Sequence, residues 1–524
     1  MTSERNTYDV VVVGAGHNGL VAASYLARAG LSVLVLERLA HVGGATVSAV
    51  PFPGQPARLS RYAGLVSLLP EQLMGDLDLD LELRSRAASA YAPTVRDGSH
   101  GGLLVERPEG PATADSFRSL TGTDDEYAAW QAFHAGVGDL AGVVAPTLLE
   151  PLPTERTVRE QVDPAVWNDL VTTPIGEVIE RRFADDTVRG LAAADAAVGS
   201  FASTHDPSLV QNRAFLYRLM GNGTGEWRVP VGGMGALTDA LARTAAGAGA
   251  ELVTSAGVSR IHGVDGGAEV TWHDGHSTHG VTARHVLADV APWVLRILTG
   301  QGEDPESKPQ GSQLTINLLL DRLPQLRSGL DPEVAFAGTF HVAADYSRLE
   351  AAYAEAASGR VPTLVPGAVQ CHTLTDRTVL GDAPEGMHTL SYLGVHTPAA
   401  LFEGDDRDAI KALAVERALA AINEHLVEPI EKCLATDGSG RPCIEAMVPQ
   451  DVEAELAMPG GHLHHGDLDW PWAPNRARLD TPAQQWGVQT DVDSVLVCGS
   501  GARRGGGVSG IGGHNAAQAV LAGR

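Results

Sequence analysis

The stretch between Tyr8 and Glu37 constrains the fold of this chain more than any other part of the sequence. It opens with a continuous β-branched run, Val10–Val13, which is typical of a parallel strand buried on both faces. A glycine string follows, Gly14-Ala15-Gly16-His17-Asn18-Gly19, and then a stretch of helical composition over 17–29. The next apolar run, 31–37, returns as a second parallel strand. This order predicts the opening of a dinucleotide-binding α/β fold.

Backbone geometry explains why glycine occupies these positions of the string. Gly14 makes the tight turn, and Gly16 lets the backbone approach a pyrophosphate at the positive end of the following helix. Glu37 lies 21 residues after Gly16, where a carboxylate can accept both ribose hydroxyls. Because the chain has 60 glycines, a second match at 505–510 is unsurprising. The flanking strand, the helix and the small Ala23 distinguish the first match from the second.

A second glycine pair favours FAD over NAD as the nucleotide. Glu37 and Arg38 are followed by the loop His41-Val42-Gly43-Gly44-Ala45-Thr46, which a simple NAD fold does not need. This arrangement resembles the motif of flavoproteins in the glutathione reductase and amine oxidase superfamily. In that superfamily the Gly-Gly loop meets the pyrophosphate and ribityl region of FAD. The same resemblance implies that Val258 meets the adenine through its backbone.

The C-terminal glycine-rich string, from Val497 to Ala517, is the most specific stretch of the sequence. It resembles the closing FAD motif of the phytoene desaturase and retinol saturase group, where a glycine-rich loop and a helix start pass under the flavin. Stretches 59–62, 229–237 and 460–470 resemble the branch of this family whose substrate is uncertain. The chain departs from many relatives at Ala45, where they carry arginine, so phytoene itself is not an expected substrate.

These motifs together predict an FAD site. We expect the following residues to contact FAD: Gly14, Ala15, Gly16, Asn18, Gly19, Glu37, Arg38, Gly43, Gly44, Ala45, Thr46, Val258, Gly499, Gly507, Val508, Ser509 and Gly510.

The spacing of the motifs predicts an α/β fold with two domains. A discontinuous, Rossmann-like FAD-binding domain of the glutathione reductase and amine oxidase type takes residues 1–85, 225–300 and 486–524. An inserted α+β substrate domain takes residues 86–224 and 301–485. Within the insertions we expect a helix-rich stretch over 115–220, a strand over 313–321 and a long helix over 408–434.

Composition excludes several classes of partner. Lys and Arg number 38 against 64 Asp and Glu, and the formal net charge of −26 repels nucleic acid and anionic membranes. The four cysteines show no C-x-x-C spacing, so we expect no disulfide framework, no metal site and a cytoplasmic location. Neither a signal peptide nor a membrane-spanning run is visible. Peripheral membrane contact and a homo-oligomer stay open.

The candidates for acid or base chemistry are His464, His465 and Asp467. A histidine near its ordinary pKa suits proton transfer, and a carboxylate can orient it. The alternative is that all three cap turns or bond the backbone. The three residues lack a suitably spaced fourth ligand for a metal.

The sequence predicts an FAD-dependent oxidoreductase that oxidises a mostly apolar small molecule by hydride transfer to the flavin. The insertions contain no run of basic residues suited to a polyanion, so we expect an apolar substrate. Two alternatives stay open. One is an amine or alcohol oxidase that passes electrons to O₂, and the other is a flavin-stabilised binding protein without turnover.

Overall fold

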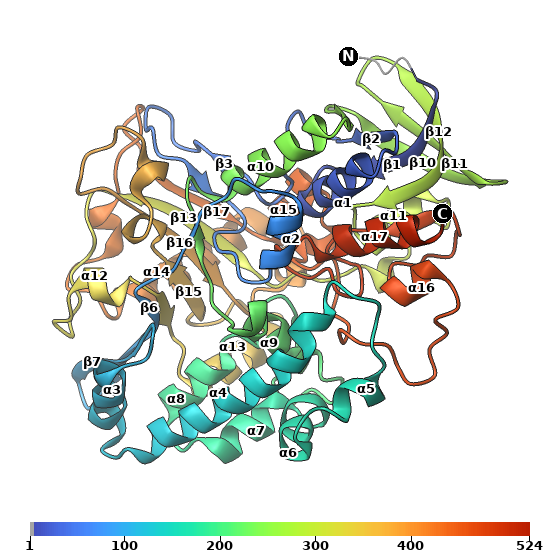
Figure 1. Cartoon of the computed structure of the whole chain (residues 1–524). Helices are drawn as coiled ribbons and strands as arrows, with labels where there is room; N and C mark the ends of the chain where they lie inside the picture. The colour runs from blue at the N-terminus through green and yellow to red at the C-terminus, as the bar shows by residue number, and fades with distance from the viewer. Residues whose placement is uncertain (1–4) are drawn as a thin grey trace.

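The structure is a computed structural model that describes residues 5–524 (Figure 1). Its first seven-stranded sheet is built around β1 (Thr7–Val13), which pairs in parallel with β2 (Val33–Leu36) and with β12 (Thr278–Ala288). The strand β9 (Glu251–Val253) extends the sheet beside β2, and β18 (Val495–Val497) pairs in parallel with β12. Three separated stretches of chain therefore meet in one sheet, and the FAD-binding Rossmann-like domain is discontinuous.

An antiparallel hairpin lies at the edge of this sheet. It is formed by β10 (Gly257–Val264) and β11 (Gly267–His273), which pair antiparallel, and β11 continues antiparallel into β12. Gly266 takes a φ of +77° in the first turn and Gly275 a φ of +88° in the second, a region that favours glycine.

Three helices cover one face of the sheet around the glycine string. The helix α1 (His17–Arg28) packs between α10 (Met234–Gly247) and α17 (Ile511–Ala522), so the first and the last helix of the chain lie side by side (Figure 1). The approach of α17 to α1 is very close. A Cβ atom added at Gly513 would lie 2.0 Å from the carbonyl oxygen of Asn18. Only glycine fits this helix crossing without displacing the backbone.

The second seven-stranded sheet is antiparallel except between β14 and β6. Its strand order is β17-β13-β16-β15-β14-β6-β7. The bounds are β6 Ala88–Arg96, β7 Ser99–Glu106, β13 Leu314–Leu320, β14 Thr339–Val342, β15 Gly367–Gln370, β16 His388–Gly394 and β17 Ile444–Met447. The strand expected over 313–321 is β13, and its alternating pattern lies over a core that includes Ile316 and Leu318.

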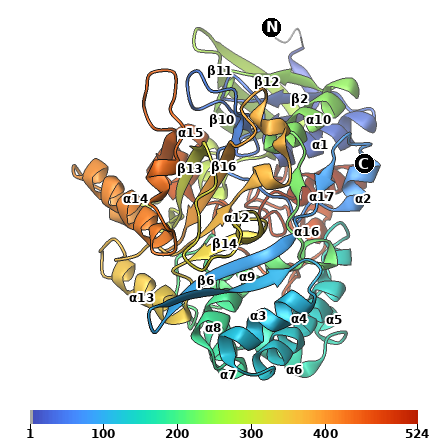
Figure 2. The same ribbon diagram turned by 90° about the vertical axis from the view of Figure 1, so that its left-hand side faces the viewer.

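The helix-rich stretch predicted over 115–220 forms a layer below the second sheet in the views of Figures 1 and 2. Its helices are α3 Pro111–Thr121, α4 Asp125–Val144, α5 Glu155–Arg159, α6 Pro164–Trp167, α7 Ile175–Arg182, α8 Asp186–Ala193 and α9 Val210–Leu219. The aromatic rings of Trp130, Phe133, Phe183 and Phe215 pack in its interior.

The prediction of a long helix over 408–434 is wrong at the C-terminal end of that range. The helix α14 runs over Arg407–Asn423, and a separate 3₁₀ turn follows at Ile430–Cys433. Leu426 leaves the helix to form an isolated β-bridge with Leu326, and both side chains are buried. Burial of this leucine pair therefore overrides the helical pattern, and Pro429 disfavours its resumption.

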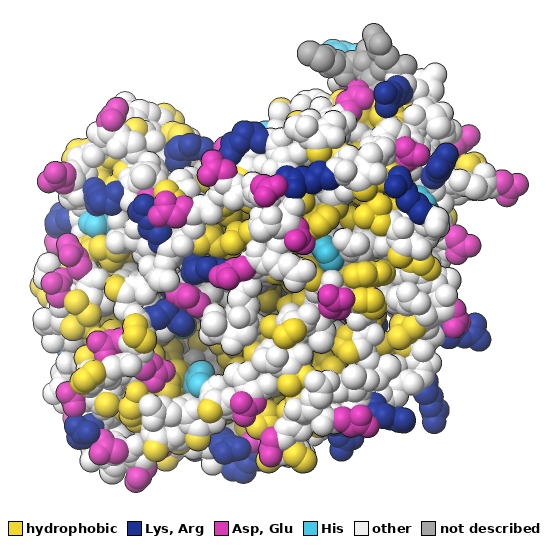
Figure 3. All heavy atoms as spheres, in the orientation of Figure 1, with side chains coloured by type: hydrophobic (Ala, Val, Ile, Leu, Met, Phe, Trp, Pro, Cys, Tyr) yellow, Lys and Arg dark blue, Asp and Glu magenta, His cyan; other side chains and the backbone are white. Residues whose placement is uncertain are grey.

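Short elements complete the fold. The helices are α2 Glu71–Asp76, α11 Pro292–Leu298, α12 Pro332–Ala335, α13 Tyr346–Ala357, α15 Pro449–Leu456 and α16 Pro482–Trp486. The strands are β3 Ser48–Ala49, β4 Leu59–Ser60, β5 Leu83–Arg84 and β8 Val229–Pro230. Over residues 5–524, none of the helices has the length and hydrophobicity that crossing a membrane requires. Charged side chains of both signs are scattered over the face shown in Figure 3, without a region of one sign.

Candidate active site

The parallel strands of the first sheet all end at the same edge. Gly14 follows β1, Glu37 follows β2, Asp289 follows β12, and Gly499 lies two residues beyond β18. Because these strands run in parallel, their carboxyl ends lie together, which is where open α/β sheets bind ligands. The sheet topology thus gathers four residues that are far apart in the sequence.

Glu37 connects the two glycine loops. Its carboxylate is 8% exposed and accepts backbone hydrogen bonds from Ala15 at 2.8 Å and from Leu39 at 2.7 Å. The backbone N–H of Gly43 in turn donates to the carbonyl oxygen of Ala15 at 2.8 Å. The glycine string and the Gly43-Gly44 loop therefore lie against each other, with the carboxylate fixed beside both.

Asp289 is a residue of this site that the sequence analysis missed. Its Oδ2 atom accepts a hydrogen bond from the backbone of Gly19 at 2.9 Å, and the amide of Gly16 bonds the same carboxyl group. Burial, together with the nearby charge of Glu37, raises the pKa of Asp289 to about 8, although the hydrogen bonds from Gly19 and Gly16 oppose this shift. The only signal in the sequence was its position directly after a strand of the predicted sheet.

A cleft extends from these loops to the second sheet, and we call it the cofactor cleft. Nine of the predicted FAD contacts line it: Gly14, Gly16, Glu37, Arg38, Gly44, Ala45, Val258, Gly507 and Val508. The wall opposite includes Thr315 and Asn317 of β13 and Tyr392 of β16.

The other predicted contacts lie behind the lining of the cleft. These are Ala15, Asn18, Gly19, Gly43, Thr46, Gly499, Ser509 and Gly510. Several of them hold the shape of the loops. Thr46 donates to the carbonyl of Gly43 at 2.6 Å, and Gly510 takes a φ of +72° immediately before α17.

The residues of the cleft fit FAD. A Cβ atom at Gly14 or Gly16 would lie 2.7 or 2.6 Å from atoms of Asp289, so the close backbone approach needs both glycines. Asn18 is 1% exposed, and neither polar atom of its side chain has a hydrogen-bond partner in the described chain. Because Asn18 lies behind the lining of the cleft, its amide is no contact for a ligand there, whereas the backbone N–H groups at the start of α1 can bind a phosphate.

His464 and His465 line the cofactor cleft, and both are neutral at physiological pH. Burial lowers the pKa of His464 to about 3 and that of His465 to about 4. The Nδ1 atom of each ring is buried without a partner in the described chain. His465 also takes a φ of +64°, which is uncommon for a non-glycine residue.

Asp467 does not orient either of these histidines, so the expected arrangement is wrong on this point. Its carboxylate accepts a hydrogen bond from Ser200 at 2.9 Å and lies 3.6 Å from Nε2 of His462. Asp467 does not line the cofactor cleft. Its partners are therefore His462 and the remote Ser200, not His464 or His465.

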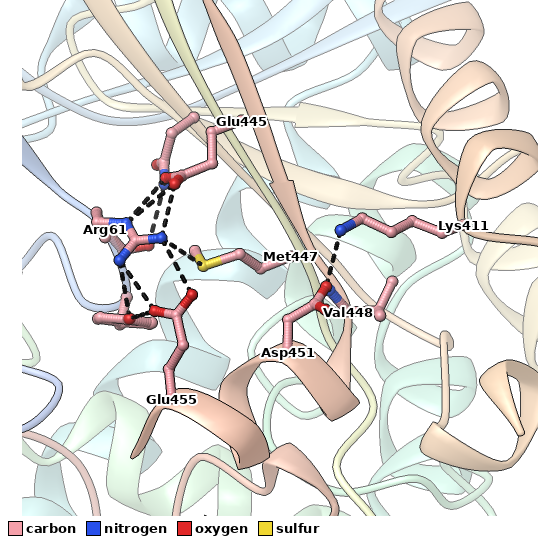
Figure 4. Close-up of polar contacts among 9 residues, drawn as sticks. Arg61, Lys411, Glu445, Met447, Val448, Asp451 and Glu455 are labelled. Carbon is pink, nitrogen blue, oxygen red and sulfur yellow. Dashed lines mark hydrogen bonds and ion pairs between the residues drawn. The ribbon is translucent and has the colours of Figure 1, made fainter. Parts of the chain in front are cut away.

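Arg61 fixes the wall of the cleft near the second sheet (Figure 4). Its guanidinium pairs with Glu445 of β17 at 2.7 Å and with Glu455 of α15 at 2.9 Å. The amide of Asn317 on β13 donates to the carbonyl oxygen of Arg61 at 3.1 Å. The charge of Arg61 is therefore balanced by two carboxylates, and its role is to join the segment after β4 to the second sheet.

A second cavity of about 320 Å³ adjoins the cofactor cleft, and we call it the inner cavity. It lies between the second sheet and the helical layer, and its walls include Ala90 of β6, Trp130 of α4 and Leu349 of α13. The residues that line both spaces are Leu65, Val198, Arg218, Trp227 and Gln370.

A nucleotide-type sheet with a glycine cradle and an adjoining cavity is the arrangement that FAD-dependent oxidoreductases use. A family model described as an NAD(P)-binding Rossmann-like domain matches residues 12–64. An uncharacterized protein of Mycobacterium tuberculosis is 45% identical over 537 residues, covering 100% of this chain and 98% of that protein. The chain belongs to the family of that protein.

Two further proteins share the architecture over nearly their whole length. The mouse pyridine nucleotide-disulfide oxidoreductase domain-containing protein 2 is 29% identical over 564 residues, covering 98% of this chain and 93% of that protein. A solved structure of a putrescine oxidase with redesigned cofactor binding superposes with a TM-score of 0.60. It is 17% identical and covers 99% of both chains, so it shows the likeness of the fold alone.

Proposed function

We propose that the protein oxidises a mostly apolar small molecule held in the inner cavity, as a dehydrogenase or desaturase similar to the phytoene desaturase and retinol saturase group. The observation that carries this proposal is the shared wall between the inner cavity and the cofactor cleft. When bound, FAD supplies the ability to accept a hydride from carbon. A cytoplasmic location is part of the same proposal.

The chain's own residues contribute binding, exclusion of water and a proton acceptor. Gly16, Glu37 and Gly507 line the nucleotide end, while Leu65 and Val198 form an apolar boundary toward the inner cavity. The imidazole rings of His464 and His465 are neutral, so each can accept a proton, and the Nδ1 atom of each ring has no partner in the described chain. Their low pKa means that a proton accepted there is held only briefly.

Anaerobic titration of the yellow protein tests the proposal. A panel of apolar terpenoids, alcohols and amines is added without oxygen, and the visible absorbance of the flavin is followed. Bleaching by an apolar member supports the dehydrogenase or desaturase, and release of peroxide after oxygen is admitted identifies an oxidase. If no compound bleaches the flavin, including those identified by mass spectrometry of the purified protein, the result favours the binding protein without turnover.

A further inference from the structure

The inner cavity contains a buried cation without a counter-ion. Arg86, just before β6, is 8% exposed and lines the cavity. Its Nε atom donates to the carbonyl oxygen of Trp227 at 3.1 Å, and its Nη1 atom donates to the hydroxyl of Thr339 at 3.0 Å. Among residues 5–524, no carboxylate oxygen lies within the 4.0 Å that defines an ion pair with this guanidinium. Both recorded hydrogen bonds are to neutral oxygen atoms.

The carboxylates that line the inner cavity are engaged with other groups. Asp195 pairs with Nε of Arg218 at 2.7 Å. Glu106 accepts a backbone hydrogen bond from the first turns of α3 at 3.0 Å. Glu109 accepts from the indole of Trp130 at 3.1 Å. None of the three is therefore a direct partner of Arg86.

The surroundings of Arg86 make its charge costly without a ligand. Burial and the charge of Arg107 lower its pKa to about 10, against the opposing charges of Asp195 and Glu226, which lie beyond ion-pair distance, so the guanidinium is still charged at neutral pH. A buried charge without a partner is strongly unfavourable, and proteins ordinarily pair it. Arg61 and Arg218, which are only half-buried, each contact a carboxylate at 2.7 Å. The fully buried Arg504 instead donates to the backbone carbonyl oxygens of Thr147, Glu150 and Trp486. Among the described residues, Arg86 has no carboxylate and a single backbone carbonyl as partners, and it lies in a cavity that adjoins the cofactor cleft.

We propose that Arg86 binds the carboxylate of an amphipathic substrate whose apolar body fills the inner cavity toward the cofactor cleft. This inference rests on the proposed function and narrows it to an apolar acid. A guanidinium presents two parallel N–H groups that match the two oxygens of a carboxylate. Trp227 contacts Arg86 through its carbonyl oxygen and also lines the cofactor cleft, so the acid end and the reacting end lie in adjoining spaces.

Binding to the FAD-loaded protein tests the inference without turnover. The probes are two matched series: decanoate, decanol and decylamine, and phenylbutyrate, phenylbutanol and phenylbutylamine. Affinity is measured by calorimetry and by the change in the visible spectrum of the flavin. In at least one series we expect the acid to bind about tenfold or more tightly than the alcohol and the amine. Equal affinities within both series, or no binding by either acid, would overturn the inference.

Substitution at Arg86 identifies the group responsible. Arg86→Met should remove the preference for the acid, and Arg86→Lys should retain part of it, because lysine keeps the charge but not the paired geometry. The control is Arg84→Met, since Arg84 is exposed and pairs with Glu82 at 2.7 Å. Retained preference in a folded, FAD-loaded Arg86→Met protein would contradict the role of Arg86. If Arg86→Met does not fold, the lysine variant and the wild-type preference decide.

The two proposals fail separately. If an acid binds tightly but no compound bleaches the flavin, the anion site is supported and the proposed oxidation is refuted. If a neutral or cationic molecule bleaches the flavin and neither acid binds, the proposed oxidation is supported and the anion site is refuted.

Discussion

The Oδ2 atom of Asp289 lies 2.9 Å from the backbone nitrogen of Gly19, although the two residues are 270 positions apart in the sequence. The contact is at the start of α1, where nucleotide-binding folds place a phosphate. A carboxyl group there competes with an anion when it is charged and can donate a hydrogen bond to it when it is protonated. The protonation of Asp289 therefore bears on both stability and FAD binding.

In the FAD-free protein, we expect Asp289 to contribute stability that is lost as the pH rises from about 4 to about 8, while buried histidines such as His464 and His465 contribute the opposite trend between about 4 and 6.5. The pKa of Asp289 is raised from 3.8 to about 8, so in this range the folded state binds a proton that the unfolded chain has lost. Asp289→Asn should weaken this pH dependence, whereas Asp139→Asn on the exposed face of α4 should not. Urea unfolding at several pH values measures it. Equal slopes in wild type and Asp289→Asn would contradict the expectation.

FAD affinity should depend on pH through the same group. Above about pH 8 the ionised Asp289 repels the diphosphate of FAD, so binding should weaken in wild type. The Asp289→Asn protein should show little change over the same range. Titration of FAD-free protein with FAD, followed by flavin fluorescence, gives the affinities. If the FAD affinities of wild type and Asp289→Asn change with pH in parallel, Asp289 does not act on the bound nucleotide.

Glu37→Ala should lower FAD affinity by about tenfold to a hundredfold, because it removes a charged acceptor at the ribose position. The change also deletes two backbone hydrogen bonds that hold the loops, from Ala15 and Leu39. Glu37→Gln keeps part of the accepting capacity and should lose less. Glu71→Ala, at a side chain that is 68% exposed, is the control. Unchanged affinity in equilibrium dialysis of Glu37→Ala would show that Glu37 does not contact FAD.

Gly513→Ala should destabilise the protein by about 1 to 3 kcal/mol through overpacking between α17 and α1. The added methyl group would meet the carbonyl oxygen of Asn18 at 2.0 Å. The matched control is Gly142→Ala in α4, where nothing lies within 4 Å and alanine is the better helix former. The melting temperature and the FAD occupancy of Gly513→Ala should therefore fall. Those of Gly142→Ala should stay the same or rise. Similar melting temperatures would refute the tight helix contact.

His464→Gln and His465→Gln should slow flavin reduction by the substrate while FAD binding is retained. General base catalysis contributes about a hundredfold to ten-thousandfold, so at least one variant should show a loss of that order. Because burial lowers the two pKa values to about 3 and about 4, wild-type reduction should show no histidine titration above about pH 5. Stopped-flow measurement in the absence of oxygen gives the rates. If both variants reduce the flavin at the wild-type rate, neither histidine takes part in proton transfer.

The sequence by itself determined the strand, glycine turn and helix that begin the chain. These features depend on residues that are neighbours in the chain: Val10–Val13 supply the buried strand, and Gly14 and Gly16 supply backbone conformations and approaches that other residues resist. Glu37 could be predicted as well, because one helix and one returning strand fix its distance from the turn. The FAD cofactor was expected from the resemblance of the Gly43-Gly44 loop and the C-terminal glycine string to flavoprotein motifs.

Only the tertiary structure decided how distant side chains meet. Asp289 reaches the glycine string because β12 pairs in parallel with β1, and Asp467 bonds Ser200 because two remote loops pack together. The sequence showed no run of basic residues, yet folding brings Arg86 and Arg218 to one cavity and gives a carboxylate partner only to the second. Such relations depend on burial and charge pairing between segments far apart in the chain, which local sequence patterns do not encode.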